Sequence, residues 1–521
     1  MKKLLIVLCA LALALPVFAQ VTMRVANGSE IESIDPSQIS GVQSARVYQA
    51  LFEGLVIYDP KDASPIPGVA ESWTVSADQT TFTFKIRKGI TWSDGTPITA
   101  QQVADSWIRT LDPKTGSEYA SSLTDVIKGA ADFNAGKAPA SSVAVKAVDA
   151  STFQFTATSP KPYAIAQLAH HAFAIFPMHA IAKYGKDWVL PQNFVGNGPF
   201  TLKEYSPQQR LVAVKNAKYW DAANVKLDQI IYIPSEDLNT TWNMYLNGEV
   251  DWNTNSPPPE KIDEALARKD FQNSKQLGTY YYEFAAMRKP FNDPRVRKAF
   301  SLAVDRQELV SKITKGGQIP ALTYFPTMTG YPSPKGLAMD REQAKKLLAD
   351  AGYAGGKGLP VLKLGYNTSS AHKKIAEYLQ QTWQQVLGVQ IELTNVEFST
   401  FLQQRKDGNL GGFDIARAGW IGDFIDPWNF LYMFLSDNKD FNDPRWNNPQ
   451  YDQLVQKANL MPAGLERNKV FAQAEQLLVE QDLPIMPIYF YTTQEMIDTS
   501  KWGGYYGNLL NVHEPKFFVK K

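Results

Sequence analysis

The most informative stretch of this sequence is RAGWIGDFIDP, which occupies residues 417–427. Taken alone, it is the end of a strand followed by a loop rich in glycine and aromatic residues. The loop carries two acids, Asp423 and Asp426. Acids spaced in this way are commonly solvated loop side chains, and a pair that acts in acid–base catalysis needs a cleft around it. The rest of the sequence is needed to distinguish solvated acids, a catalytic pair and a binding role.

Strands and helices are intermixed on both sides of this stretch. Apolar patterning predicts strands at 21–26, 81–86, 151–157, 211–214, 230–233, 389–394 and 485–491. Helices are predicted at 99–111, 293–304, 340–352, 372–387, 398–406 and 465–481. Thr99 and Gln102 have the spacing of a capping box at the start of the first helix. The predicted class is therefore α/β.

Length and charge limit the classes of function. At about 150 residues per domain, 521 residues suggest three lobes. Lys and Arg number 53 against 52 Asp and Glu. The chain therefore offers no basic field for a nucleic-acid backbone, and we expect no nucleic-acid partner.

The N-terminus has the features of a secretory signal peptide at residues 1–19. Two lysines precede an apolar run at residues 4–15, and small residues stand at Val17 and Ala19. Cys9 allows lipoprotein anchoring as an alternative, but Leu8 is a poor residue before a lipidated cysteine. We expect an exported protein whose mature chain has no transmembrane segment, because no other apolar run reaches 18 residues.

The sequence lacks the common motifs of enzymes and metal sites. It contains no H-E-x-x-H, no G-x-S-x-G and no phosphate-binding G-x-x-x-x-G-K-[ST]. The only cysteine is Cys9. His170, His171 and His179 form the one histidine group with a spacing near that of metal ligands, and a structural role explains it better. We therefore expect no metal, no cofactor and no catalytic residue.

Several segments taken together resemble one family, the periplasmic oligopeptide-binding proteins of ABC transporters (solute-binding protein family 5). The resemblance covers the mature chain in order, and each segment alone would be weak. The segments are NGSE (27–30), LFEGL (51–55), VAESW (69–73), WSDGTPITA (92–100), NGPFTLK (197–203), TYYYE (279–283), FNDPRVR (291–297) and the opening stretch.

The resemblance implies a class II-type periplasmic-binding-protein-like fold. Two ligand-gripping lobes would be joined by a hinge, and an additional third lobe would pack on the first. Lobe I would comprise residues 20–52, 178–278 and 491–521, the extra lobe II residues 53–177, and lobe III residues 279–490. These boundaries come from the family and not from composition.

The resemblance also implies a ligand site. Asp423 matches the acid that pairs with the α-ammonium of a peptide, and such a pair in a dry cleft makes a short charge-assisted bond. Gly419, Ile421 and the segment around Val42 match strands that bind the peptide backbone. Arg417, Arg405 and His372 match basic groups that meet the peptide carboxylate. Asn255 and Tyr119 match polar residues near the ligand. The aromatic residues expected to line the side-chain pockets are Trp420, Phe398 and Tyr491.

The chain departs from the family pattern at three places. A glutamate near the ammonium is replaced by Ser40, and a lysine that meets the carboxylate of short peptides aligns with Thr314. The cysteine pair of the family falls on Gly278 and Ile421, so that disulfide is absent. The first two changes leave the preferred length and charge of the ligand open.

We expect a monomeric receptor that closes over short peptides and delivers them to an inner-membrane ABC permease, without catalysis. Closure would shift an equilibrium between open and closed forms. One alternative is the same scaffold with another cargo, namely a murein peptide, a metal chelate, haem or an oligosaccharide. The other is an exported hydrolase that uses Asp423 and Asp426.

Overall fold

The computed structural model describes residues 20–117, 119–439 and 441–521, and the side chains of Phe398 and Ser399 lie outside this description. The predicted signal peptide at residues 1–19, together with Cys9, also lies outside the described residues. In the described part of the chain, none of the helices combines the length and apolarity that a membrane crossing requires.

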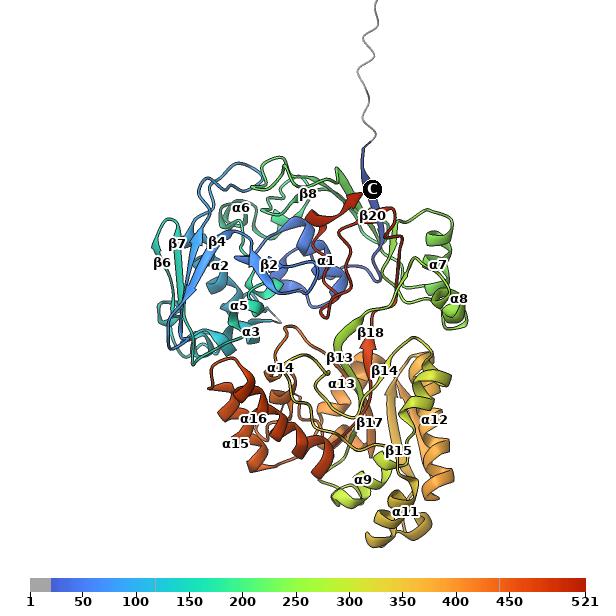
Figure 1. Cartoon of the computed structure of the whole chain (residues 1–521). Helices are drawn as coiled ribbons and strands as arrows, with labels where there is room; N and C mark the ends of the chain where they lie inside the picture. Colours follow the sequence, from blue (N-terminus) through green and yellow to red (C-terminus); the bar gives the residue numbers. More distant parts are fainter. Residues whose placement is uncertain (1–19, 118, 440) are drawn as a thin grey trace, which may run out of the picture.

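Three sheets organise the described chain, and we call the parts built around them lobes I, II and III. Lobe I, in the upper half of Figure 1, contains a seven-stranded sheet in the order β12-β19-β11-β1-β10-β9-β8. β1 pairs in parallel with β10, so distant parts of the chain lie side by side. The strands are β1 (Thr22–Ala26), β8 (Phe200–Ser206), β9 (Arg210–Lys215), β10 (Gln229–Ile233), β11 (Trp252–Asn253), β12 (Phe271–Gln272) and β19 (Glu495–Ile497), accompanied by helices α1 (Val42–Leu51), α6 (Met178–Tyr184), α7 (Leu238–Leu246) and α8 (Ile262–Leu266).

Lobe II also lies in the upper half, beside lobe I (Figure 1). Its antiparallel sheet has the order β4-β5-β7-β6, and phenylalanines on β7 pack against Trp107 of α2 and against phenylalanines on β5. The capping box predicted at Thr99 is confirmed, because both of its hydrogen bonds are present. The elements are β4 (Ala70–Val75), β5 (Thr81–Ile86), β6 (Val145–Asp149), β7 (Thr152–Thr156), α2 (Ala100–Leu111), α3 (Ala120–Val126), α4 (Ala130–Asn134) and α5 (Ala164–Gln167).

Lobe III forms the lower half, around a six-stranded sheet in the order β14-β18-β13-β17-β15-β16 (Figure 1). Separate buried clusters lie on its two faces, one built on α9, α11 and α12 and the other on α14, α15 and α16. The strands are β13 (Lys275–Phe284), β14 (Ile319–Pro320), β15 (Leu362–Asn367), β16 (Ile391–Val396), β17 (Ile415–Ile421) and β18 (Ile485–Thr492). The helices are α9 (Pro294–Leu302), α11 (Arg341–Asp350), α12 (Ser370–Leu387), α13 (Phe398–Lys406), α14 (Trp428–Leu431), α15 (Pro449–Asn459) and α16 (Leu465–Gln476).

Two paired strands connect the lower half to lobe I. β13 follows directly on β12, and β18 leads directly into β19, so both strands pass between the halves (Figure 1). A third link joins the backbone N–H of Leu277 to the carbonyl of Leu509, at 2.6 Å. This narrow connection is the arrangement expected of a hinge. The residue boundaries of the lobes stay a prediction.

Several predicted elements differ from the structure by a few residues at their ends, and two of these differences are informative. The strand predicted at 389–394 begins at Ile391, because Gly388 ends α12 with a φ of 72° and a close approach to Gly355 leaves no room for a Cβ there. The helix predicted at 465–481 is α-helical only to Gln476 and continues as a π-helical turn to Gln481.

Candidate functional site

The opening stretch forms β17 and the loop that follows it. β13 pairs with β17 along its whole length, whereas β15 pairs with it only at Ile415 and Ala416. From Arg417 to Ile421 the second edge of β17 therefore has no ladder partner among the described strands. Gly419 and Ile421 are exposed there, Ile421 at 44%. An unpaired strand edge of this kind is a template for an added strand.

Gly419 is required by its neighbours on β17 and β18. A Cβ at this position would lie 2.6 Å from the hydroxyl of Tyr491 and 3.2 Å from the Arg417 guanidinium. Both side chains take part in one hydrogen bond, in which Nη2 of Arg417 donates to Tyr491 at 3.0 Å. Glycine thus keeps the exposed edge narrow while the charged side chain stays beside it.

Asp423 lies just beyond this edge and has no ion-pair partner among the described residues. Its backbone N–H donates to Oδ1 of Asn429 at 3.0 Å, and the same oxygen accepts from the indole of Trp420 at 3.3 Å. Burial raises the pKa of Asp423 to about 6, and a hydrogen bond between its carboxyl and the side chain of Asn429 partly offsets this shift. The carboxylate is therefore held in place but is not neutralised by a protein cation.

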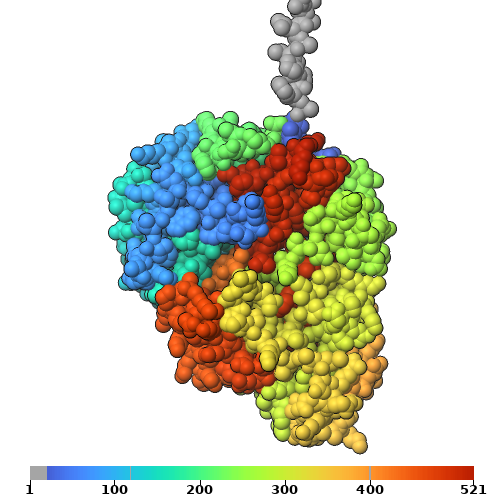
Figure 2. Space-filling model, in the orientation of Figure 1, coloured from blue at the N-terminus to red at the C-terminus, as the bar shows by residue number. Residues whose placement is uncertain are grey.

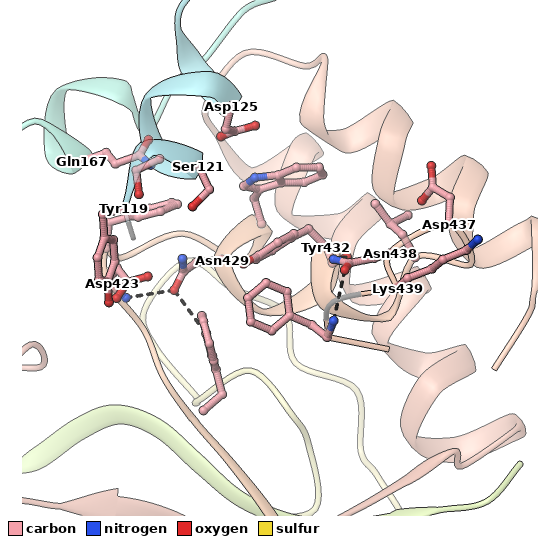
Figure 3. Close-up of a pocket in the computed structure, with 16 residues that line it drawn as sticks. Tyr119, Ser121, Asp125, Gln167, Asp423, Asn429, Tyr432, Asp437, Asn438 and Lys439 are labelled. Atoms are coloured by element: carbon pink, nitrogen blue, oxygen red, sulfur yellow. Dashed lines mark hydrogen bonds between the residues drawn. The ribbon is translucent and has the colours of Figure 1, made fainter. Parts of the chain in front are cut away.

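A cavity of about 680 Å³ opens beside Asp423, between lobes II and III. Figure 3 shows side chains from both lobes pointing into it. Lobe II contributes Tyr119, Ser121, Ser122, Asp125 and Gln167, and lobe III contributes Trp420, Phe424, Trp428, Asn429, Tyr432 and Phe441 with neighbouring residues. Most of these residues cannot be predicted from the sequence, because nothing in the local sequence of residues 121–125 or 167 relates them to a loop 250 or more positions away.

The second acid of the opening stretch has a different role. Asp426 is 8% exposed, and its two oxygens accept from Nη1 and Nη2 of Arg467 at 2.7 and 2.9 Å. Arg467 is itself 2% exposed. This two-bond ion pair anchors the loop to α16 and engages both oxygens that an acid–base catalyst would need.

Arg417 lies at the other end of the free edge, and the part of the chain that the structure describes offers its guanidinium no carboxylate within ion-pair distance. It donates to Tyr491 and to Oδ1 of Asn367 at 3.3 Å, and it lies 4.7 Å from the ring centre of Tyr280. Its Nε is buried without a hydrogen-bond partner. The sequence predicted a cation here, and the structure leaves its charge uncompensated.

His372 lies beside Arg417, with its Nδ1 3.2 Å from the hydroxyl of Tyr280. Burial, and then the nearby Arg417 charge, lower the pKa of His372 to about 3. At neutral pH this side chain is therefore an uncharged hydrogen-bonding group rather than a second cation.

Arg405 is engaged within the protein. It forms ion pairs with Asp443 at 2.7 Å and Glu283 at 3.2 Å, and its Nη1 donates to the carbonyl of Arg417 at 3.2 Å. Its side chain is only 11% exposed. The structure thus shows Arg405 supporting β17, and the expected contact with a ligand carboxylate stays a prediction.

The remaining predicted residues lie on several elements. Asn255 donates to the carbonyl of Ser235 at 2.9 Å, and Tyr119 packs against the rings of His170 and His171. Val42 is 66% exposed at the first turn of α1, where the family comparison had led us to expect a strand. Ser40 is exposed in the loop before that helix. Phe398 begins α13, but its side chain lies outside the described residues.

The histidine group separates in space. The rings of His170 and His171 are 4.0 Å apart, whereas His179 pairs with Asp94 at 2.8 Å. Within the described ranges, no three metal-ligating side chains come together.

Lobes joined by a two-strand hinge, with a cavity between them, define a class II-type substrate-binding protein. The chain belongs to the bacterial extracellular solute-binding proteins, family 5, whose profile matches residues 64–442.

The chain is similar over nearly its whole length to several oligopeptide- and murein peptide-binding proteins. The chain is 38% identical over 510 residues to the periplasmic oligopeptide-binding protein OppA of Salmonella typhimurium, covering 95% of this chain and 92% of OppA. The crystal structure of an oligopeptide-binding protein from Borrelia burgdorferi superposes with a TM-score of 0.84 at 34% identity, covering 96% and 100% of the two chains. The murein tripeptide-binding protein MppA of Escherichia coli gives a TM-score of 0.82 at 34% identity, covering 96% and 99%.

Replacing Asp423 by Asn should raise thermal stability at high pH. Because burial raises the pKa of this carboxyl to about 6, the folded state binds more protons than the unfolded chain between about pH 4 and pH 6. The contribution of Asp423 to the free energy of unfolding therefore falls as the pH rises through that window. Above it, the full cost of burying the ionised carboxylate is present. We expect Asp423→Asn to be more stable by about 1–3 kcal/mol at pH 8 and equal to the parent near pH 4, as measured by thermal unfolding. Asp437→Asn, at an exposed acid of the same cavity, is the control. Equal melting temperatures of the parent and Asp423→Asn at pH 8 would contradict a raised pKa of Asp423.

Replacing Asp426 by Asn should destabilise the protein, because it leaves the buried Arg467 charge without its partner. We expect a loss of about 3–5 kcal/mol. The double variant Asp426→Leu/Arg467→Met should recover much of this loss, because no charge then remains buried. Chemical denaturation measures both variants. If Asp426→Asn were as stable as the parent, the anchoring role would be wrong.

Proposed function

We propose that the protein is a periplasmic receptor that binds short peptides between its lobes and delivers them to an inner-membrane ABC permease. One observation carries the proposal. A carboxylate, Asp423, and a guanidinium, Arg417, lie at opposite ends of a free strand edge, and neither has a counter-charge among the described residues. A peptide offers the complement of this arrangement, with an ammonium, a backbone and a carboxylate in that order.

The free edge of β17 suits recognition that ignores side chains. An extended peptide added to Arg417–Ile421 would use its main-chain N–H and C=O groups, which every sequence provides. Six positions separate Arg417 from Asp423 in sequence, which corresponds to about 20 Å in an extended strand. A span of this length fits a peptide of a few residues.

The charged ends would supply selectivity for free termini. An ammonium beside Asp423 forms a charge-assisted hydrogen bond in a place where the isolated carboxylate is poorly solvated. Arg417 presents a planar fork that can hold a carboxylate with two bonds. With His372 neutral, Arg417 is the cation that meets the C-terminus at physiological pH.

The rival proposals fit these observations less well. Haem, metal chelates and oligosaccharides do not combine an ammonium with a carboxylate, whereas a murein peptide does and stays within the proposed class. A hydrolase that uses both acids conflicts with the ion pair between Asp426 and Arg467. The proposal requires no metal and no cofactor, and it takes the receptor to be a monomer.

Calorimetric titration with a tripeptide and its N-acetylated form tests the proposal. We expect the free peptide to bind and the acetylated one to bind at least 100-fold more weakly, because acetylation removes the charge that Asp423 pairs with. Asp423→Asn should weaken binding of the free peptide to a similar degree, while Glu342→Gln, at an exposed acid outside the cavity, leaves it nearly unchanged. Equal binding of the two peptides, or full affinity in Asp423→Asn, would contradict the proposal.

Binding should also weaken in mild acid. With a pKa of about 6, only about a tenth of Asp423 is ionised at pH 5, so affinity should fall about tenfold between pH 8 and pH 5. The Asp423→Asn variant should lose most of this pH dependence. A parent protein whose affinity is constant over this range would exclude Asp423 as the partner of the ammonium.

A further inference from the structure

Lobe II touches the Asp423 loop directly. The ring of Tyr163, just before α5, stacks on Phe424 with ring centres 4.9 Å apart and an angle of 17° between the planes. The hydroxyl of Tyr163 lies 3.4 Å from Oδ1 of Asn459, at the end of α15. Both contacts cross from lobe II to lobe III, and Phe424 is the residue after Asp423. On the left of Figure 2, the orange surface of lobe III lies against the blue-to-teal surface of lobe II.

Lobe II holds Tyr163 in a fixed position for this contact. The Nζ of Lys161 donates to the Tyr163 hydroxyl at 3.0 Å and pairs with Asp125 at 3.0 Å. The same hydroxyl lies 3.1 Å from the second oxygen of Asp125. The Lys161 side chain is only 4% exposed, and its Nζ lies 5.5 Å from the ring centre of Trp428 in lobe III. Lys161 thus adds a cation–π contact across the same boundary.

The surface on the lobe III side is equally fixed. Phe424 is 4% exposed, and Asp426, two residues later, is held by the buried ion pair with Arg467. If the lobes rotate about β13 and β18, two side chains on such supports keep or lose their contact as a whole. Such a contact adds its free energy to one of the two arrangements of the lobes and not to the other.

We propose that Tyr163 and Lys161 are positioning residues that form an interlobe latch, which stabilises the closed arrangement and slows the escape of any bound peptide. The inference rests on the proposed peptide-binding function, because it assigns lobe II a part in it. Tyr163 and Lys161 are not among the residues that line the cavity, so we expect the latch to act on every peptide alike. An offset-stacked aromatic pair of this kind shifts an equilibrium about five- to tenfold.

Stopped-flow binding with two tripeptides of different sequence, together with small-angle X-ray scattering, tests the latch. We expect Tyr163→Ala to raise the dissociation rate of both peptides by about the same factor, five- to tenfold, with little change in the association rate. Tyr163→Phe keeps the ring and should restore most of the parent rate. In the absence of peptide, Tyr163→Ala should have a larger radius of gyration than the parent, because more molecules are open.

A double-mutant cycle with Phe424→Ala separates the latch from a local packing defect, since Tyr163 is itself 3% exposed. If the two rings act through each other, the dissociation rate of the double variant is no faster than that of the faster single variant. Tyr184→Ala, at a half-buried residue packed against the cores of lobes I and II, is the control and should leave the dissociation rate unchanged.

Two results would overturn the latch. One is a parent-like dissociation rate and radius of gyration in Tyr163→Ala. The other is a cycle in which the effects of the two single variants multiply. A parent protein that bound no peptide would instead contradict the proposed function, and the scattering of the peptide-free variants would still test the latch.

Discussion

The architecture depends on keeping two opposite charges apart inside one protein. A carboxylate that is partly buried, and a guanidinium with a buried nitrogen, would each be more stable beside the other or in water. The protein places Asp423 and Arg417 at opposite ends of one strand edge and holds them with neutral groups, Asn429 and Tyr491 among them. Gly419 keeps the edge between them open. The two charges therefore remain available to a ligand that carries both complements.

Other charged side chains of the same region form ion pairs within the protein, and these pairs hold the scaffold around the site in place. Arg467 neutralises Asp426 beneath the loop, and Arg405 is shared between Asp443 and Glu283 behind β17. Burial raises the pKa of Glu283, and the neighbouring Arg405 charge opposes this shift. Lobe II completes the region from the other side of the cavity. With such supports on both sides, we expect the cleft to change shape by lobe rotation rather than by loop movement.

Local patterns in the sequence were sufficient for much of the secondary structure but not for the division of charge. The capping box at Thr99 and the α/β class follow from residue spacing, and the likeness of short motifs gave the lobed fold. In sequence, Arg405 and Arg417 look alike, yet one is paired with acids 122 and 38 positions away and the other is not. Pairings such as β1 with β10, and cavity walls from residues 119–125, depend on contacts that periodicity does not encode.

The most direct test of the account is the number of protons released when a peptide binds at pH 6. Calorimetry in buffers of different ionisation enthalpy measures this number. The account predicts release of about half a proton per peptide, because Asp423, with a pKa of about 6, becomes fully ionised when it pairs with the ammonium. The Asp423→Asn variant should release none by this route. Binding of the parent protein without proton release would contradict the central claim that the peptide ammonium binds at Asp423.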